Sequence, residues 1–206
     1  MNNYLNFPVW KEVYYYDGQG FMVRKDLGIN SVKDLSGASV CTNTGTSTET
    51  NMADYFKANG LEYKPVIFEK SEEVKSAYDT GRCDAYSSDV SGLYVQRKLL
   101  ANPDAHDILP EVISKEPLGP LVRQEDPAFK DLAAWTHHCM VNAEEYGVTQ
   151  ANADEMKNSN NPNIRRLLGV EANGADKLGV GADFCAKIIK HVGNYGEAYD
   201  RNVGKD

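Results

Sequence analysis

A strand that runs through a glycine turn directly into a helix constrains the fold of this chain more than any other stretch. Residues 39–49 have the sequence SVCTNTGTSTE. Thr46 and Glu49 have the spacing of a capping box, which predicts a helix over about residues 48–59 that ends before Gly60. A helix start this rich in hydroxyl groups offers unpaired N–H groups, a positive dipole end and O–H donors around one point. The stretch is interpreted either as a small anion-binding site or as an ordinary helix cap.

Further strands and helices alternate around this central unit. Residues 14–23 have a strand–turn–strand pattern with Asp17 and Gly18 as the turn. We then expect a strand that starts at Ser39 and runs into the turn at Gly45, and strands at residues 64–68, 83–88 and 107–114. Helices are expected to begin near Thr48, Ser71 and Asp89. Such alternation is typical of the α/β class, with a doubly wound parallel sheet. Its ligands bind at the carboxyl ends of the strands, where residues 45–47 and Asp89 fall.

The pattern changes from Glu116 onwards. Pro117, Gly119 and Pro120 indicate a linker. The remainder is predicted to be mostly helical, with helices at about residues 126–147, 150–157, 164–168 and 184–189 and a loose glycine-rich segment at 171–181. The helix at 184–189 is expected to be the last one, before Gly193. The chain therefore has an α/β part followed by a helical part.

Composition narrows the class of partner. The 206 residues carry a net charge of -8, which argues against nucleic acid or an anionic membrane as the main partner. No apolar run reaches the roughly 18 residues that a membrane-spanning helix needs. The first residues, MNNYLNFP, lack the basic and apolar regions of an export signal, so we expect no signal peptide in this chain.

Asp89 is the main candidate for recognising a cation. It follows Ser87 and Ser88 at a strand end, where we expect it to lie across from the hydroxyl-rich helix start. Its alternative role is the N-cap of its own helix. A carboxylate facing an anion-binding helix start is what an α-amino acid zwitterion requires, since its ammonium needs a charged acceptor and its carboxylate needs several donors.

Signals for an enzyme or a metal site are weak. His137 and His138 are neighbours on a helix and diverge by about 100°, so they cannot chelate one ion. The chain has no G-x-S-x-G, no C-x-x-C and no dinucleotide-binding glycine motif between a strand and a helix. Each cysteine is by default a small buried hydrophobe. Cys41 and Cys83 lie at comparable heights in successive predicted strands, where a disulfide and a buried free pair are both open.

Several separated segments support one family together. They are YYDGQGFMV at 15–23, LSGASVC at 35–41, GTSTE at 45–49, GRCDA at 81–85 with Ser88-Asp89, and HVGNYGE at 191–197. This set covers nearly the whole chain from Tyr14, and it resembles the general L-amino-acid-binding periplasmic proteins of polar amino-acid ABC transporters. The resemblance implies the type 2 periplasmic binding fold, in which two α/β lobes close on a ligand.

The resemblance also implies a division into domains. Residues 1–15 are a lead-in and hinge strand, residues 16–114 are a complete second lobe, and residues 115–206 are the mostly helical C-terminal part of the first lobe. The N-terminal part of the first lobe, which family members carry, is not found in this sequence.

Roles for individual residues follow from the same resemblance. Carried over, the turn of Gly45, Thr46, Ser47 and Thr48 binds the ligand carboxylate, and Asp89 binds the ammonium. Asn43 is expected in the pocket wall.

The sequence therefore predicts a truncated solute-binding component of an amino-acid ABC transporter. It is expected to capture L-amino acids non-covalently in the periplasm and to work with a membrane permease, without catalysis, cofactor or metal. One alternative is a non-binding remnant, or a module that self-associates through an exposed first-lobe face. Another is an enzyme of the cyclohexadienyl dehydratase type on the same fold, with Asp89 as its acid or base.

Overall fold

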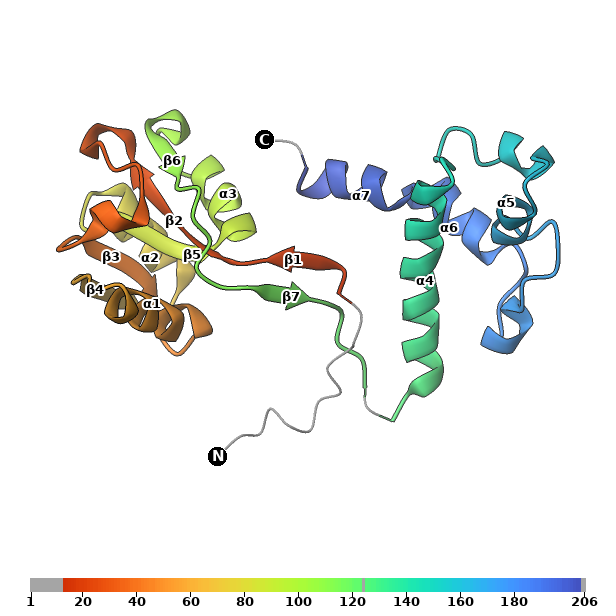
Figure 1. Cartoon of the computed structure of the whole chain (residues 1–206), viewed down its shortest axis with the longest axis horizontal. Helices are drawn as coiled ribbons and strands as arrows, with labels where there is room; N and C mark the ends of the chain where they lie inside the picture. The colour runs from red at the N-terminus through yellow and green to blue at the C-terminus, as the bar shows by residue number, and fades with distance from the viewer. Residues whose placement is uncertain (1–12, 124, 205–206) are drawn as a thin grey trace. The chain divides into compact units, whose positions relative to one another are not determined.

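A computed structural model describes residues 13–123 and 125–204, which form two compact units. The α/β unit comprises residues 15–118, and the helical unit comprises residues 13–14 and 119–204 of the described chain (Figure 1). Most of the predicted lead-in at residues 1–15 lies outside the described residues.

A five-stranded sheet forms the centre of the α/β unit, in the order β4-β3-β5-β2-β6. Its strands are β2 Gln19–Arg24, β3 Ser39–Asn43, β4 Lys64–Phe68, β5 Ala85–Asp89 and β6 His106–Ile108. β3 pairs in parallel with β4 and β5, whereas β2 runs antiparallel to β5 and β6. The predicted parallel sheet is therefore wrong for β2. Helix α3 (Val90–Lys98) packs on β2 and connects β5 to β6. β2 lies between these two strands in the sheet and runs in the opposite direction to both.

Helices pack on both faces of this sheet, which confirms the α/β class and the doubly wound arrangement. Alternate strand residues point to opposite faces, so Phe21 and Val23 join one core and Met22 joins the other. The first core contains Met52 and Phe56 of α1 (Ser47–Ala58). The second contains side chains from α2 (Ser71–Asp79) and α3, among them Val74, Tyr78 and Leu93. The remaining elements of this unit are the 3-10 turns η2 Lys25–Leu27, η3 Val32–Leu35 and η4 Pro103–Ala105.

The first and last strands of the α/β unit form a separate two-stranded ribbon. β1 (Tyr15–Asp17) pairs antiparallel with β7 (Glu116–Leu118). Both strands predicted within residues 14–23 are present, but they lie in different sheets. Pro117, predicted to lie in a linker, belongs to β7, and the boundary between the two units falls between Leu118 and Gly119. Gly18 does not make a hairpin turn. A Cβ at Gly18 would lie 2.3 Å from Val112 Cγ1 and 2.5 Å from the Ser114 carbonyl oxygen. Glycine is needed there because the returning backbone passes too closely for a side chain.

The strand predicted at residues 107–114 is shorter in the structure. β6 ends at Ile108, and Pro110 follows soon after. Proline has no N–H group to continue the ladder. Beyond the strand, the Leu109 and Ile113 amides still donate to carbonyls of β2, at 2.8 Å each.

The helical unit packs its helices around one core. Its elements are α4 Pro127–Glu145, η5 Glu155–Asn158, α5 Pro162–Leu167, η6 Ala175–Leu178, α6 Phe184–Val192 and α7 Tyr195–Asn202. Ala143, Ile164, Leu168 and Ile189 are among the core residues. None of the helices in the described part of the chain is long and apolar enough to cross a membrane.

Two helix predictions in this unit differ from the structure. The helix expected at 150–157 is a series of turns ending in η5, because Asn152 accepts from the Thr149 amide at 2.7 Å and donates to the Gly147 carbonyl at 2.9 Å. The helix at 184–189 is not the last, since α7 follows it. The start of α7 is a capping box in which the Asn194 and Glu197 side chains bond to each other's backbone amides.

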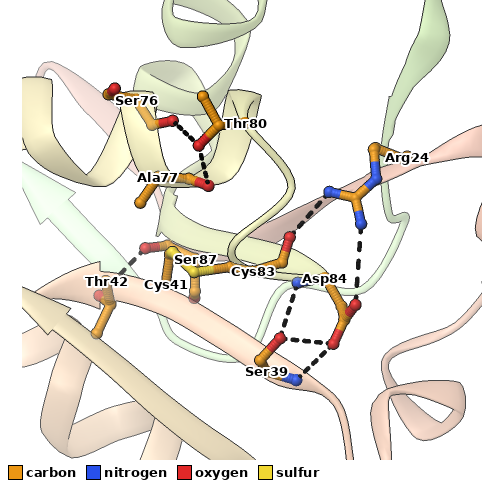
Figure 2. Close-up of a disulfide and its surroundings, with 10 residues drawn as sticks. All are labelled: Arg24, Ser39, Cys41, Thr42, Ser76, Ala77, Thr80, Cys83, Asp84 and Ser87. Carbon is orange, nitrogen blue, oxygen red and sulfur yellow. Dashed lines mark hydrogen bonds and ion pairs between the residues drawn. A yellow bond between two sulfur atoms is a disulfide. The ribbon is translucent and has the colours of Figure 1, made fainter.

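All four cysteines form disulfides. Cys41 is joined to Cys83, with Cα atoms 5.7 Å apart, and Cys139 is joined to Cys185, with Cα atoms 5.3 Å apart. The second bond ties α4 to α6, a pairing not expected from the sequence. Figure 2 shows the first bond, between β3 and the residues that lead into β5, beside the hydrogen bond from the Arg24 guanidinium to the Cys83 carbonyl.

Candidate functional site

A hollow of about 460 Å³ lies at the carboxyl ends of β3, β4 and β5, entirely within the α/β unit. It is lined by Thr42, Asn43, Thr44, Thr46, Ser47, Thr48, Glu69, Ser71, Ser88 and Asp89. The hollow therefore contains every predicted ligand-binding residue except Gly45. Open α/β sheets bind their ligands at this edge.

The start of α1 faces the hollow without a side-chain cap. Thr46 is the N-cap residue by position, but its hydroxyl donates to the Asn43 carbonyl at 3.0 Å instead of accepting from the helix. The predicted capping box between Thr46 and Glu49 does not form, because the Glu49 carboxylate accepts from the Gly45 amide at 2.9 Å. The first N–H groups of α1, at Ser47 and Thr48, are therefore left without a side-chain partner among the described residues. They can bind an anion.

A buried glutamine, which was not among the predicted site residues, holds the helix start against the sheet. The Gln19 amide nitrogen donates to the Thr48 carbonyl at 3.0 Å and to the Ser87 hydroxyl at 2.9 Å. Gln19 is fully buried. Burying an amide is costly unless it is hydrogen-bonded, so these two bonds stabilise the position of α1 over β5. A glutamine at the start of a strand whose next four residues are apolar or glycine was its signal in the sequence.

Asp89 ends β5 and lies beside two other carboxyl groups. Burial raises the pKa of Asp89 to about 6, and the charges of Glu116 and Asp17 add to this shift, as does a side-chain hydrogen bond with Glu116. Asp89 precedes α3 in the N-cap position, but its side chain does not cap that helix. At neutral pH most of the group is ionised, so it can accept from a ligand ammonium.

Strand pairing brings these carboxyl groups together. Asp17 is opposite Glu116 in the ribbon, and Gln19, two residues further along, is opposite Asp89 in the sheet. Asp17 accepts from the Gly18 amide at 2.8 Å and from the Ser91 hydroxyl. Glu116 accepts from the Ser114 hydroxyl at 2.7 Å. Asp17 and Glu116 were not among the predicted site residues, because their pairing depends on a ribbon between segments about a hundred residues apart.

The far side of the hollow is also polar. Asn43 lies at the end of β3, and its side-chain oxygen accepts from the Ser71 hydroxyl at 3.4 Å. Glu69 directly follows β4. No lysine or arginine of the described chain lines the hollow.

A second hollow, of about 470 Å³, lies within the helical unit next to the Cys139–Cys185 disulfide. Its lining includes the rings of Trp135, Tyr146 and Phe184 and the cations Arg166 and Lys177. No carboxylate of the described residues lines it. His137 and His138 lie on α4 outside this lining, and the ring of Tyr14 stacks on His137 with centroids 4.0 Å apart.

Known proteins resemble this chain over almost its whole length. It is 58% identical over 199 residues to the general L-amino acid-binding periplasmic protein AapJ of Rhizobium johnstonii, covering 95% of this chain and 58% of that protein. It is 49% identical over 193 residues to the glutamate/glutamine/aspartate/asparagine-binding protein BztA of Rhodobacter capsulatus, covering 93% of this chain and 57% of that protein. The chain thus spans less than two thirds of the length of these relatives.

A solved structure is also similar to this chain. It is an ABC transporter periplasmic binding protein from Brucella ovis with glutathione bound, with a TM-score of 0.92 and 57% identity over 98% of this chain and 64% of that one. These relatives are named as binding proteins and not as enzymes. The NMT1/THI5-like family matches residues 12–116, about half of the chain. The chain therefore belongs to the NMT1/THI5-like family, and it has the type 2 periplasmic binding fold.

Proposed function

We propose that this chain supplies the second-lobe half of an amino-acid-binding cleft in a transporter's solute-binding protein. The ligand is an L-amino acid held without covalent chemistry. Its carboxylate binds the first turn of α1 at Ser47 and Thr48, and its ammonium binds Asp89. Residues 16–114 are the second lobe, residues 115–206 belong to the first lobe, and the ribbon of β1 and β7 acts as the hinge.

The observation that carries this proposal is the hollow itself. It combines an uncapped helix start with a carboxylate on the neighbouring strand. An α-amino acid carries its carboxylate and its ammonium on the same carbon, and charge-assisted hydrogen bonds to both are stronger than bonds between neutral groups. The hydroxyls of Ser47 and Thr48 add further donors. Asn43 contributes an amide to the wall.

The names of the relatives support a proposal for where the protein acts and with which partner. We place the protein in the periplasm, where it would deliver its ligand to a membrane permease. Two disulfides support this location, because such bonds persist in oxidising compartments and are rare in the cytosol.

Phe129 and Trp135 on α4 are 53% and 50% exposed, and Leu121 is 70% exposed. Exposed apolar side chains of this kind favour self-association of the chain through its first-lobe face.

A titration with L-amino acids tests the proposal. The chain spans about 58% of the length of its relative, so each ligand contact should resemble an exposed ion pair and the affinity should be about millimolar. Ligand-detected NMR can measure such binding. Asp89→Ala should weaken it about fivefold, or by 2–5 kcal/mol in a chain extended to the full length of the relatives.

Asp104→Ala is the matched control, because Asp104 is exposed on η4 and does not line the hollow. Equal loss of affinity in both variants, or none in either, would contradict the role of Asp89. Light scattering on the same samples tests the proposed self-association, and a monomer at all concentrations would contradict it.

A further inference from the structure

The hollow extends beyond the groups needed to bind the α-carboxylate and α-ammonium of an amino acid. Asp89 and α1 lie at the ends of β5 and β3, but the hollow continues past them to Glu69 and Ser71, after the end of β4. A ligand bound at the first two strands would therefore direct its side chain either towards β4 or out of the sheet edge. The residues after β4 are candidates for recognising that side chain.

The register of the strands places Glu69 level with Asp89. Asn43 pairs with Phe68 across β3 and β4, so Glu69 is level with Thr44. Cys41 pairs with Tyr86 across β3 and β5, so Asp89 is level with Thr44 from the other side. Two strand spacings therefore separate the backbones of Glu69 and Asp89, roughly 9–10 Å. The start of α1 follows β3, between them.

Glu69 has no charged partner of its own. It is exposed and makes no ion pair with any residue in the described ranges 13–123 and 125–204. The hollow that it lines contains a second carboxylate, Asp89, and no described cation. A cationic group entering at Glu69 would meet an available acceptor, whereas an anionic group would meet like charge.

We propose that Glu69 recognises the distal cationic group of the ligand side chain, so that the site favours L-amino acids with a basic side chain over neutral and acidic ones. This inference rests on the proposed function. The zwitterionic end of the ligand occupies Asp89 and the start of α1, and an aliphatic stem like that of arginine or lysine crosses β3 towards Glu69. Ser71, beside Asn43, supplies a second oxygen at this end of the hollow.

Arginine and citrulline provide the sharpest test, because they have similar shapes and differ in side-chain charge. We expect the 206-residue chain to bind L-arginine about threefold more tightly than L-citrulline, as for a solvent-exposed ion pair, measured by ligand-detected NMR titration. Glu69→Gln should remove this preference and leave citrulline binding unchanged. Glu62→Gln makes the same charge change at the opposite ends of the strands, before β4, and should keep the preference.

The outcomes separate this inference from the proposed function. Equal affinity for the two ligands in the unmodified chain, or a preference that survives Glu69→Gln, would overturn the role of Glu69 while leaving amino-acid binding intact. Failure to bind either ligand would overturn the proposed function together with this inference. Far-ultraviolet circular dichroism of each variant shows that the α/β unit is folded.

Discussion

The two units contain hollows of almost the same volume, about 460 Å³ and about 470 Å³, but with opposite chemistry. The hollow of the α/β unit has two carboxylates, hydroxyl groups and a helix start. The hollow of the helical unit has three aromatic rings and two cations, and no carboxylate of a described residue. Only the first offers both a charged acceptor and several donors, as an amino acid zwitterion requires. The arrangement of charge, and not the size of the cavity, identifies the candidate site.

The units also differ in how they are stabilised. The α/β unit has a hydrophobic core on each face of its sheet. Among its described residues the helical unit has one core cluster and a disulfide between α4 and α6, and it exposes Phe129 and Trp135 on α4. We therefore expect the fold of the α/β unit to depend less on its disulfide than the fold of the helical unit does. The following predictions test that difference, from the largest effect to the smallest.

Removing a central ring of the α/β unit should have the largest effect. Phe56 is fully buried and packs against Phe21 and Tyr63. Phe56→Ala should lower the free energy of unfolding by about 3–5 kcal/mol, because it removes buried apolar surface and leaves a cavity. Urea denaturation measures the loss, and Tyr94→Ala, at a residue 38% exposed, should cost much less. Equal losses would show that the first core is not what stabilises this unit.

The disulfides should matter more to the helical unit. The two bonds span 42 and 46 residues, so their effects on the unfolded chain are nearly equal. Replacing Cys139 and Cys185 with alanine should destabilise the chain by about 2–4 kcal/mol and reduce hydrogen-exchange protection in α4 and α6. The corresponding Cys41 and Cys83 variant should leave protection in the helical unit unchanged. Unaltered exchange in α4 after loss of Cys139–Cys185 would contradict this comparison.

Asp89→Asn should stabilise the chain modestly. The pKa of Asp89 is raised from 3.8 to about 6, so the folded protein holds a proton that the unfolded chain releases between these values. Stability therefore falls as pH rises from 4 to 6, and this cost remains above pH 6. At pH 7.5 Asp89→Asn should raise the free energy of unfolding by about 1 kcal/mol after allowance for solvent screening.

The gain from Asp89→Asn should disappear below pH 4, where Asp89 is protonated in both states. Denaturation at pH 3.5 and pH 7.5 tests this sign. Asp104→Asn, at an exposed residue outside the cluster, should show no such difference. A destabilising effect of Asp89→Asn at pH 7.5 would contradict the pKa shift.

Local patterns in the sequence predicted much of the α/β unit. β3, α1, β4 and α2 lie within one or two residues of their expected positions, because hydrophobic periodicity and glycine stops are local signals. Asp89 and the start of α1 were expected at one sheet edge for the same reason, and the structure places them around one hollow. Their roles in binding a ligand stay predictions.

The errors concern interactions between distant segments. The antiparallel direction of β2 depends on which strands it lies between, and the ribbon of β1 and β7 pairs segments far apart in the sequence. The carboxyl group of Glu49 accepts from the Gly45 amide, and it forms no capping box with Thr46. The role of Gln19 also depends on distant residues. The residue pattern of β2 cannot show that the Thr48 carbonyl and the Ser87 hydroxyl lie within hydrogen-bonding distance of the Gln19 side chain.

A residue-resolved NMR titration tests the central claim, that an amino acid binds the hollow of the α/β unit. L-arginine added to the isotope-labelled chain should shift the backbone amides of Ser47, Thr48 and Asp89 in a saturable way. The amides of Trp135 and Lys177, which line the hollow of the helical unit, should not move. Saturable shifts confined to Trp135 and Lys177, with Ser47 and Thr48 unaffected, would contradict the account.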